Sequence, residues 1–342
     1  MDYQSLWFIL WGVLWAVYFM TDGFDLGVGI LHNFIGKTDG DKRTIINTIG
    51  PVWDGNEVWL VTAGGVTFAA FPAAYASMFS YLYSPLLIIL LALIVRGVAF
   101  EFRGKADGKT WKKAWDAAIF LCSLVPALLF GVAFGNIFQG LPVDRAGYHG
   151  SLLMLLNPYG LLTGVLFVLL FIVHGALWIS MKTLGALSAR AVAVAGRFWA
   201  ALLLVAILFL INTAFQTKLY DNYIANAFWF MVPFLAVICL LAVRIFIYKR
   251  GYFKAFMASF LTIGLVTLTG IIGLYPNLIP SSLDPAYSLT LMNASSSPYT
   301  LKIMTVVVLV FIPIVIAYQI WVYTVFRGKL VVDEVLKDPE AY

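Results

Sequence analysis

The sequence predicts an all-α integral membrane protein in which nine helices cross the bilayer. Of its 342 residues, 62% are apolar and only 11% are charged, whereas soluble domains carry about 25% charged residues. Apolar stretches of about 20 residues, the length needed to span a bilayer, recur along the whole chain. This composition excludes a soluble enzyme, a disordered protein and a coiled coil. The 22 basic and 17 acidic residues form no dense basic stripe, so no nucleic-acid partner is expected.

The predicted spans follow one another with short connections. The alternating strands of a membrane barrel are absent, so the spans are read as helices. The longest loops, 139–157 and 276–299, are too short for an extramembrane domain, and we therefore expect a single polytopic domain over 1–342. In chain order the nine spans are 5–31, 51–71, 77–100, 115–138, 158–181, 197–216, 226–248, 254–275 and 300–326.

The basic residues predict the orientation of the chain. Of the 22 Lys and Arg residues, 18 lie in loops on one side of the predicted membrane, three lie on the other side, and Arg96 lies inside a span. Because cytoplasmic loops carry the excess of Lys and Arg, the N-terminus is predicted outside and the C-terminus in the cytoplasm. An odd number of spans agrees with this assignment.

Ionisable groups inside spans cost at least ~2.5–3.5 kcal/mol each on insertion scales, so each is a functional candidate. Three consecutive helices place six of them at similar depth in the cytoplasmic half: Asp22, Asp25, Asp54, Glu57, Arg96 and Glu101. The i,i+3 spacing puts Asp22 and Asp25 on one helix face, and Asp54 and Glu57 on another. If these groups share a pocket, we expect Arg96 to neutralise one carboxylate.

Two interpretations of these acids stay open. A wet chain of carboxylates open to the cytoplasm is what a proton intake path needs, and a role in such a path or in a structural network is favoured for Asp22, Asp25 and Asp54. Helix capping or contact with headgroup water is favoured for Glu57 and Glu101, since the helix dipole stabilises anions in the first turn.

The histidines and cysteines have no metal-ligand spacing, so no metal site is predicted. Cys122 and Cys239 lie in apolar stretches without a CxxC motif. His174 lies within the fifth predicted helix. It could be a packing residue, a proton relay or a haem ligand, and packing is the favoured interpretation. His32 and His149 are expected to be solvated.

Two strings carry a resemblance to a known family. Thr21-Asp22-Gly23-Phe24-Asp25-Leu26-Gly27-Val28-Gly29 and Trp53-Asp54-Gly55-Asn56-Glu57-Val58-Trp59-Leu60 resemble the first-helix and second-helix motifs of subunit II of cytochrome bd-type quinol oxidases. Further similarity runs through Arg96–Arg103, Gly131–Asn136 and Asn157–Leu162 to the end of the chain.

The resemblance implies two four-helix bundles, 1–140 and 155–276, followed by a peripheral helix at 299–327. It implies a heterodimer with a haem-bearing subunit I and, in some members, a small single-span subunit. The haems (b and d, or b only) and the quinol site would lie in subunit I, and no haem in this chain. Some members hold a structural quinone in subunit II. The membrane would be the prokaryotic plasma membrane.

The activity implied is quinol oxidation coupled to reduction of oxygen to water, with protons taken from the cytoplasm and a gradient built without pumping. Asp54 matches the family's second-helix aspartate, and the resemblance implies that it belongs to a proton path. Asp25, Asp22 and Glu57 are the next candidates for this path, and Arg96 and Glu101 are expected to form a charge network. The alternatives are a proton-coupled secondary transporter and a structural scaffold without a proton role.

Overall fold

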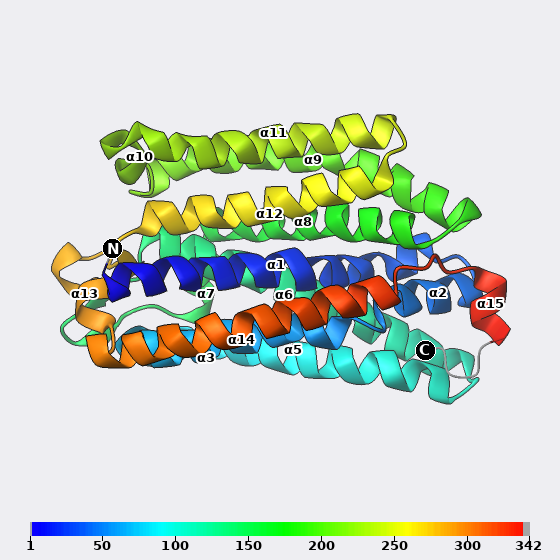
Figure 1. The fold of residues 1–342 in the computed structure, drawn as a ribbon, viewed down its shortest axis with the longest axis horizontal. Helices are drawn as coiled ribbons and strands as arrows, with labels where there is room; N and C mark the ends of the chain where they lie inside the picture. The colour runs from blue at the N-terminus through cyan, green and yellow to red at the C-terminus, as the bar shows by residue number, and fades with distance from the viewer. Residues whose placement is uncertain (1, 338–342) are drawn as a thin grey trace.

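The computed structural model describes residues 2–337, which fold into a bundle of long, roughly parallel helices (Figure 1). Within them, eight helices are long and apolar enough to cross a membrane. The helices and strands, in chain order, are α1 (Tyr3–Ile35), α2 (Asp39–Ile49), α3 (Trp53–Ala70), α4 (Pro72–Tyr81), α5 (Tyr83–Phe102), η1 (Arg103–Lys105), α6 (Lys109–Gln139), β1 (Val143–Asp144), β2 (Gly147–Tyr148), α7 (Leu152–Leu155), α8 (Pro158–Lys182), α9 (Gly185–Gln216), α10 (Asp221–Ala225), η2 (Ala227–Phe230), α11 (Met231–Tyr248), α12 (Tyr252–Leu274), β3 (Asn277–Ile279), η3 (Pro285–Tyr287), β4 (Leu289–Thr290), α13 (Leu291–Ala294), α14 (Pro298–Val325) and α15 (Val332–Lys337).

Helix α3 corresponds to the predicted span 51–71 and is not among the eight apolar helices. Its first turns contain Asp54, Asn56 and Glu57, which make it more polar than its neighbours. It nevertheless packs along α1 and α14, beside the long helices (Figure 1). The predicted span 77–100 is interrupted, because α4 ends at Tyr81 and α5 begins at Tyr83.

Local sequence signals explain where several helices begin. Asp2 caps α1, accepting the Ser5 N–H at 2.7 Å. Thr38 and Asp41 form a reciprocal capping box at the start of α2, the pairing expected of a polar residue three positions after a Thr N-cap. Asn157 caps α8 with Pro158 at its first position, where a missing N–H is harmless. The polar helix α2 lies where only a loop was predicted.

The helices pack as two groups that share the central helix pair α1 and α8. In the first group, α3 and α6 pack on α1, and α5 packs on α6; in the second group, α9 and α12 pack on α8, and α11 packs on α12. Glycine permits the close crossing of α1 and α8: a Cβ on Gly27 would lie 1.8 Å from the Phe171 carbonyl oxygen. Such small residues let membrane helices approach closely.

Helix α14 runs along the outside of the first group and is held at its two ends and by polar contacts between them (Figure 1). At one end, the Trp7 indole N–H donates to the Leu301 carbonyl at 3.0 Å. At the other end, the Lys182 ammonium donates to the carbonyls of Phe326 and Gly328. Beyond it, α15 packs on α2. The ends of the described chain lie at opposite ends of the bundle, with α1 starting at the left and α15 at the right (Figure 1).

Candidate functional site: a buried charge cluster on three helices

A salt bridge between three helices lies at the centre of the first group. The Arg96 guanidinium, on α5, donates through Nη2 to Asp22 Oδ1 on α1 at 2.6 Å and to Glu57 Oε1 on α3 at 2.5 Å. Arg96 and Asp22 are fully buried, whereas the Glu57 side chain is 23% exposed. One nitrogen of Arg96 therefore contacts two carboxylates, and its single positive charge can neutralise only one of them.

A second set of contacts lies beside this salt bridge. Asp25 Oδ2, one turn after Asp22, accepts a hydrogen bond from Asn56 Nδ2 at 2.7 Å. Asn56 Oδ1 in turn accepts from the Tyr323 hydroxyl of α14 at 2.7 Å. Asp25 and Asn56 are both buried. The first-helix aspartates thus have different partners, since Asp22 pairs with a cation and Asp25 with a neutral amide.

Several atoms of these buried groups have no hydrogen-bond partner within the described chain. They are Asp22 Oδ2, Asp25 Oδ1, Arg96 Nε and Nη1, and the Tyr18 hydroxyl. Buried polar atoms are nearly always bonded to protein or to ordered water. Carboxyl oxygens with unused lone pairs, next to unused donors, form the kind of site that can accept and pass on a proton.

The remaining two acids proposed from the sequence lie outside this cluster. Asp54 precedes Glu57 by one turn of α3, and its side chain is exposed on the surface of the chain. Glu101 is exposed near the end of α5. The structure therefore brings together Asp22, Glu57 and Arg96, joins Asp25 to the same helices through Asn56, and leaves Asp54 and Glu101 at the surface.

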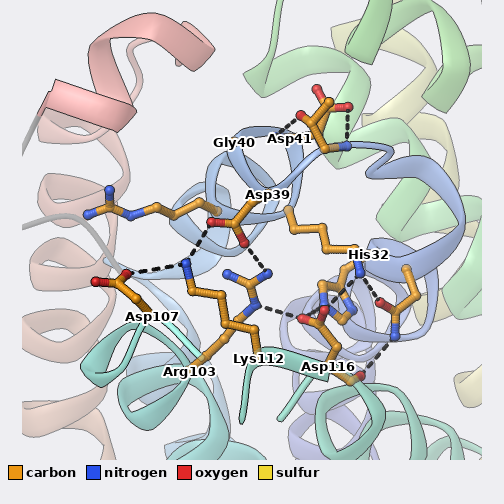
Figure 2. A network of polar contacts seen from close by, with 12 residues as sticks. His32, Asp39, Gly40, Asp41, Arg103, Asp107, Lys112 and Asp116 are labelled. Atoms are coloured by element: carbon orange, nitrogen blue, oxygen red, sulfur yellow. Dashed lines mark hydrogen bonds and ion pairs between the residues drawn. The ribbon is translucent and has the colours of Figure 1, made fainter. Parts of the chain in front are cut away.

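A second polar network, which the sequence reasoning missed, lies at the α2 end of the bundle (Figure 2). Asp116 of α6 is its centre. It accepts hydrogen bonds from Arg103 Nε at 2.6 Å and Lys42 Nζ at 2.7 Å, and its Oδ1 lies 2.9 Å from His32 Nε2. The prediction that His32 is solvated is wrong, because this side chain is fully buried. The available signal was Asp116 itself, an acid in the first turn of the predicted span 115–138.

The network continues to the surface through Asp39 in α2 (Figure 2). Asp39 accepts hydrogen bonds from Arg103 at 2.8 Å and Lys112 at 3.0 Å. Partial burial disfavours the Asp39 carboxylate, but the hydrogen bonds from Lys112 and Arg103 outweigh it and hold the pKa of Asp39 below its usual value. These contacts fasten α2 to the start of α6.

Each of the three histidines makes a polar contact through its Nε2 atom. His174 Nε2 contacts the Met20 carbonyl at 3.0 Å, and its ring stacks on Phe256 with centroids 4.5 Å apart. His149 pairs with Asp144 at 2.8 Å. The Nδ1 atoms of His32 and His174 have no hydrogen-bond partner within the described chain. In the part of the chain that the structure describes, no group of three or more His, Cys, Asp or Glu side chains is placed to hold a metal ion.

A cavity in the second group of helices has a different character. It encloses about 90 Å³ between α8, α9, α11 and α12, and is lined by residues such as Phe167, Leu202 and Leu240. Hydroxyl groups in its wall are bonded to backbone carbonyls, as Tyr223 is to Thr269 at 2.7 Å. The wall therefore offers no acid or base, and the charge cluster is the better candidate for chemistry.

Together, the apolar helices and the ionisable groups buried between them define a polytopic membrane protein with a charged core. The model of the family "Cytochrome bd terminal oxidase subunit II" matches residues 3–326. The chain belongs to this family of respiratory oxidase subunits, and a multi-pass location in the bacterial plasma membrane follows from it.

Individual relatives agree with this assignment. The chain is 41% identical over 334 residues to the cytochrome bd ubiquinol oxidase subunit 2 of Bacillus subtilis, with 96% of each chain covered. It is 36% identical over 370 residues to the cytochrome bd-I ubiquinol oxidase subunit 2 of Escherichia coli K12, with 98% of each covered. A solved chain of the bd oxidase from Geobacillus thermodenitrificans shares its fold, with a TM-score of 0.77, 19% identity, and coverage of 95% of this chain and 99% of that one.

Proposed function

We propose that this chain is the haem-free subunit II of a quinol:oxygen oxidoreductase and conducts protons from the cytoplasmic side toward haems held by subunit I. The relatives are named as ubiquinol oxidase subunits, which supports the partner and the reaction. In this proposal, nine helices including α3 cross the membrane, with the N-terminus outside and the C-terminus in the cytoplasm. Haems b and d, or b only, and the quinol site belong to subunit I, which this chain also stabilises.

The observation that carries the proton role is that the buried Asp22 and Asp25 and the partly exposed Glu57 lie around one arginine. Ionisable groups at this depth are expensive and mark ion or proton routes in membrane proteins. Glu57 is the partly exposed member of the cluster, and Asp54 lies one turn earlier on the surface of α3. Protons would enter through Asp54 and Glu57 and pass to Asp22 and Asp25.

The test is turnover of the assembled complex with one carboxyl neutralised. Asp25→Asn and Asp54→Asn should each lower oxygen consumption per haem about tenfold, equivalent to about 1.4 kcal/mol on the barrier. The haem spectrum should stay intact. Asp333→Asn, an exposed acid on α15, is the matched control and should leave turnover unchanged.

A scaffold role is the second candidate, and the salt bridge of Arg96 with Asp22 and Glu57 favours it, since structural ion pairs have the same geometry. The two roles give different results. A scaffold predicts that Asp25→Asn and Asp54→Asn reduce the amount of haem-replete complex while leaving turnover per haem unchanged. That result would refute the proton role.

A further inference from the structure

Asp25 is connected to the last long helix by a chain of two hydrogen bonds. The Tyr323 hydroxyl donates to Asn56 Oδ1 and Asn56 Nδ2 donates to Asp25 Oδ2, each at 2.7 Å. The three residues come from α14, α3 and α1, and the two inner ones are buried. No other contact of α14 reaches a carboxyl of the charge cluster among the described residues.

The orientation of the Asn56 side-chain amide determines whether Asp25 faces a hydrogen-bond donor or an acceptor. An asparagine side chain has an acceptor on one side and a two-proton donor on the other. While Tyr323 donates to Oδ1, the NH₂ group faces Asp25 and favours the ionised carboxylate. If the amide turned over, its oxygen would face Asp25, and a hydrogen bond would form only with a protonated carboxyl.

The Tyr323 hydroxyl is held in place by contacts on both sides along α14. One turn earlier, Gln319 Nε2 donates to the Gly55 carbonyl at 2.9 Å, next to Asn56. The Tyr323 ring meets Trp178 of α8 edge-on, with centroids 6.1 Å apart. Just beyond it, Lys182 binds the Gly328 carbonyl at 3.0 Å. The position of the hydroxyl is therefore set by α3, α8 and the end of α14 together.

We propose that Tyr323 is a positioning residue that orients the Asn56 amide and thereby favours the ionised form of Asp25. The proposal rests on the proton role of Asp25 given above. The other titratable groups around Asp25 are Asp22 on the same helix, Glu57 on α3 and Arg96 on α5. On α8, His174 faces α1 through the Met20 carbonyl. None of these is changed by removing the Tyr323 hydroxyl.

The experiment compares Tyr323→Phe with Tyr318→Phe in the complex purified with its natural partner. Tyr318 lies on the same helix with its side chain exposed, so it controls for loss of a hydroxyl from α14. Infrared spectra follow the carbonyl band of protonated Asp25 against pH, and the band is identified by its loss in Asp25→Asn. In Tyr323→Phe its midpoint should rise by about one pH unit, since hydrogen bonds to charged groups are worth about that much. Tyr318→Phe should match the wild type.

Turnover supplies an independent readout. Tyr323→Phe should shift the pH profile of oxygen consumption while the haem spectrum and the KM for quinol stay unchanged, and it should add nothing in an Asp25→Asn background. An unchanged infrared midpoint in Tyr323→Phe would overturn the proposal. If Asp25→Asn leaves turnover unchanged while the infrared midpoint still moves, the proton role fails and the positioning role stands.

Discussion

Removal of the Arg96 side chain should destabilise the protein more than any change at its surface. In Arg96→Met, the Nη2 atom that lies 2.6 Å from Asp22 and 2.5 Å from Glu57 is lost. A flexible apolar side chain of similar length replaces it. Two carboxyl groups then face each other without a cation. Glu57 can keep its charge through its exposed edge, but Asp22 has no contact with solvent.

The magnitude follows from the proton that Asp22 must then take up. Protonating an ordinary aspartic acid, whose pKa in water is about 3.9, costs about 4 kcal/mol at pH 7. This value agrees with the ~3–5 kcal/mol lost when one partner of a buried ion pair is removed. At pH 5 the same protonation costs only about 1.5 kcal/mol. The deficit relative to wild type should therefore shrink as the pH falls.

Thermal loss of the haem spectrum in the purified complex measures this effect, comparing each variant with wild type at pH 7 and pH 5. The triple variant Arg96→Met, Asp22→Asn, Glu57→Gln should recover most of the loss, because neutral groups replace the whole ion pair. Arg197→Met, which removes an exposed arginine, is the control. A deficit equal at both pH values, or no deficit at pH 7, would refute the reasoning.

Two further predictions concern the network at the α2 end. Asp116→Asn should destabilise the complex by at most about 3–5 kcal/mol, because the buried Arg103 then keeps only the partly exposed Asp39 as a charged partner; thermal unfolding that matches wild type would contradict this. Asp39→Asn should remove a small dependence of the free energy of unfolding on acidic pH. For a group as exposed as Asp39, this contribution should be below about 1 kcal/mol. Because the folded pKa of Asp39 is lowered, its contribution is present above the usual pKa near 4 and is lost as the pH falls through the folded value. Stability measured between pH 3 and 6 should show a flatter curve for the variant, and parallel curves would count against the contribution.

The sequence was sufficient to locate the long helices because each needs about 20 consecutive apolar residues, a property that needs no tertiary information. It also identified Asp22, Glu57 and Arg96, since charge inside an apolar segment is visible without a structure. Pairing was harder. Nothing in the spacing of Asp22 and Asp25 indicates that one meets an arginine and the other an asparagine, because those partners come from other helices.

The polar helix α2 and its network could not be read in the same way. Their residues lie in segments where charge is ordinary, so Lys42, Arg103 and Asp39 looked like solvated loop residues. Burial of His32 depends on Asp116, 84 positions away. The packing of α1 on α6 brings His32 to Asp116, and α2 then contributes Lys42 and Asp39 to the network.

The separation of Asp22 from Arg96 has a consequence for biosynthesis. Their salt bridge joins positions 74 residues apart, and at about 5–20 residues per second the ribosome needs roughly 4–15 s to make the second after the first. During that interval α1, the least apolar of the eight described helices that are long and apolar enough to cross a membrane, carries two carboxyl groups without the Arg96 guanidinium beside them. The salt bridge can therefore form only after α5 has been synthesised, and the Asn56 contact with Tyr323 only after the last long helix has been synthesised.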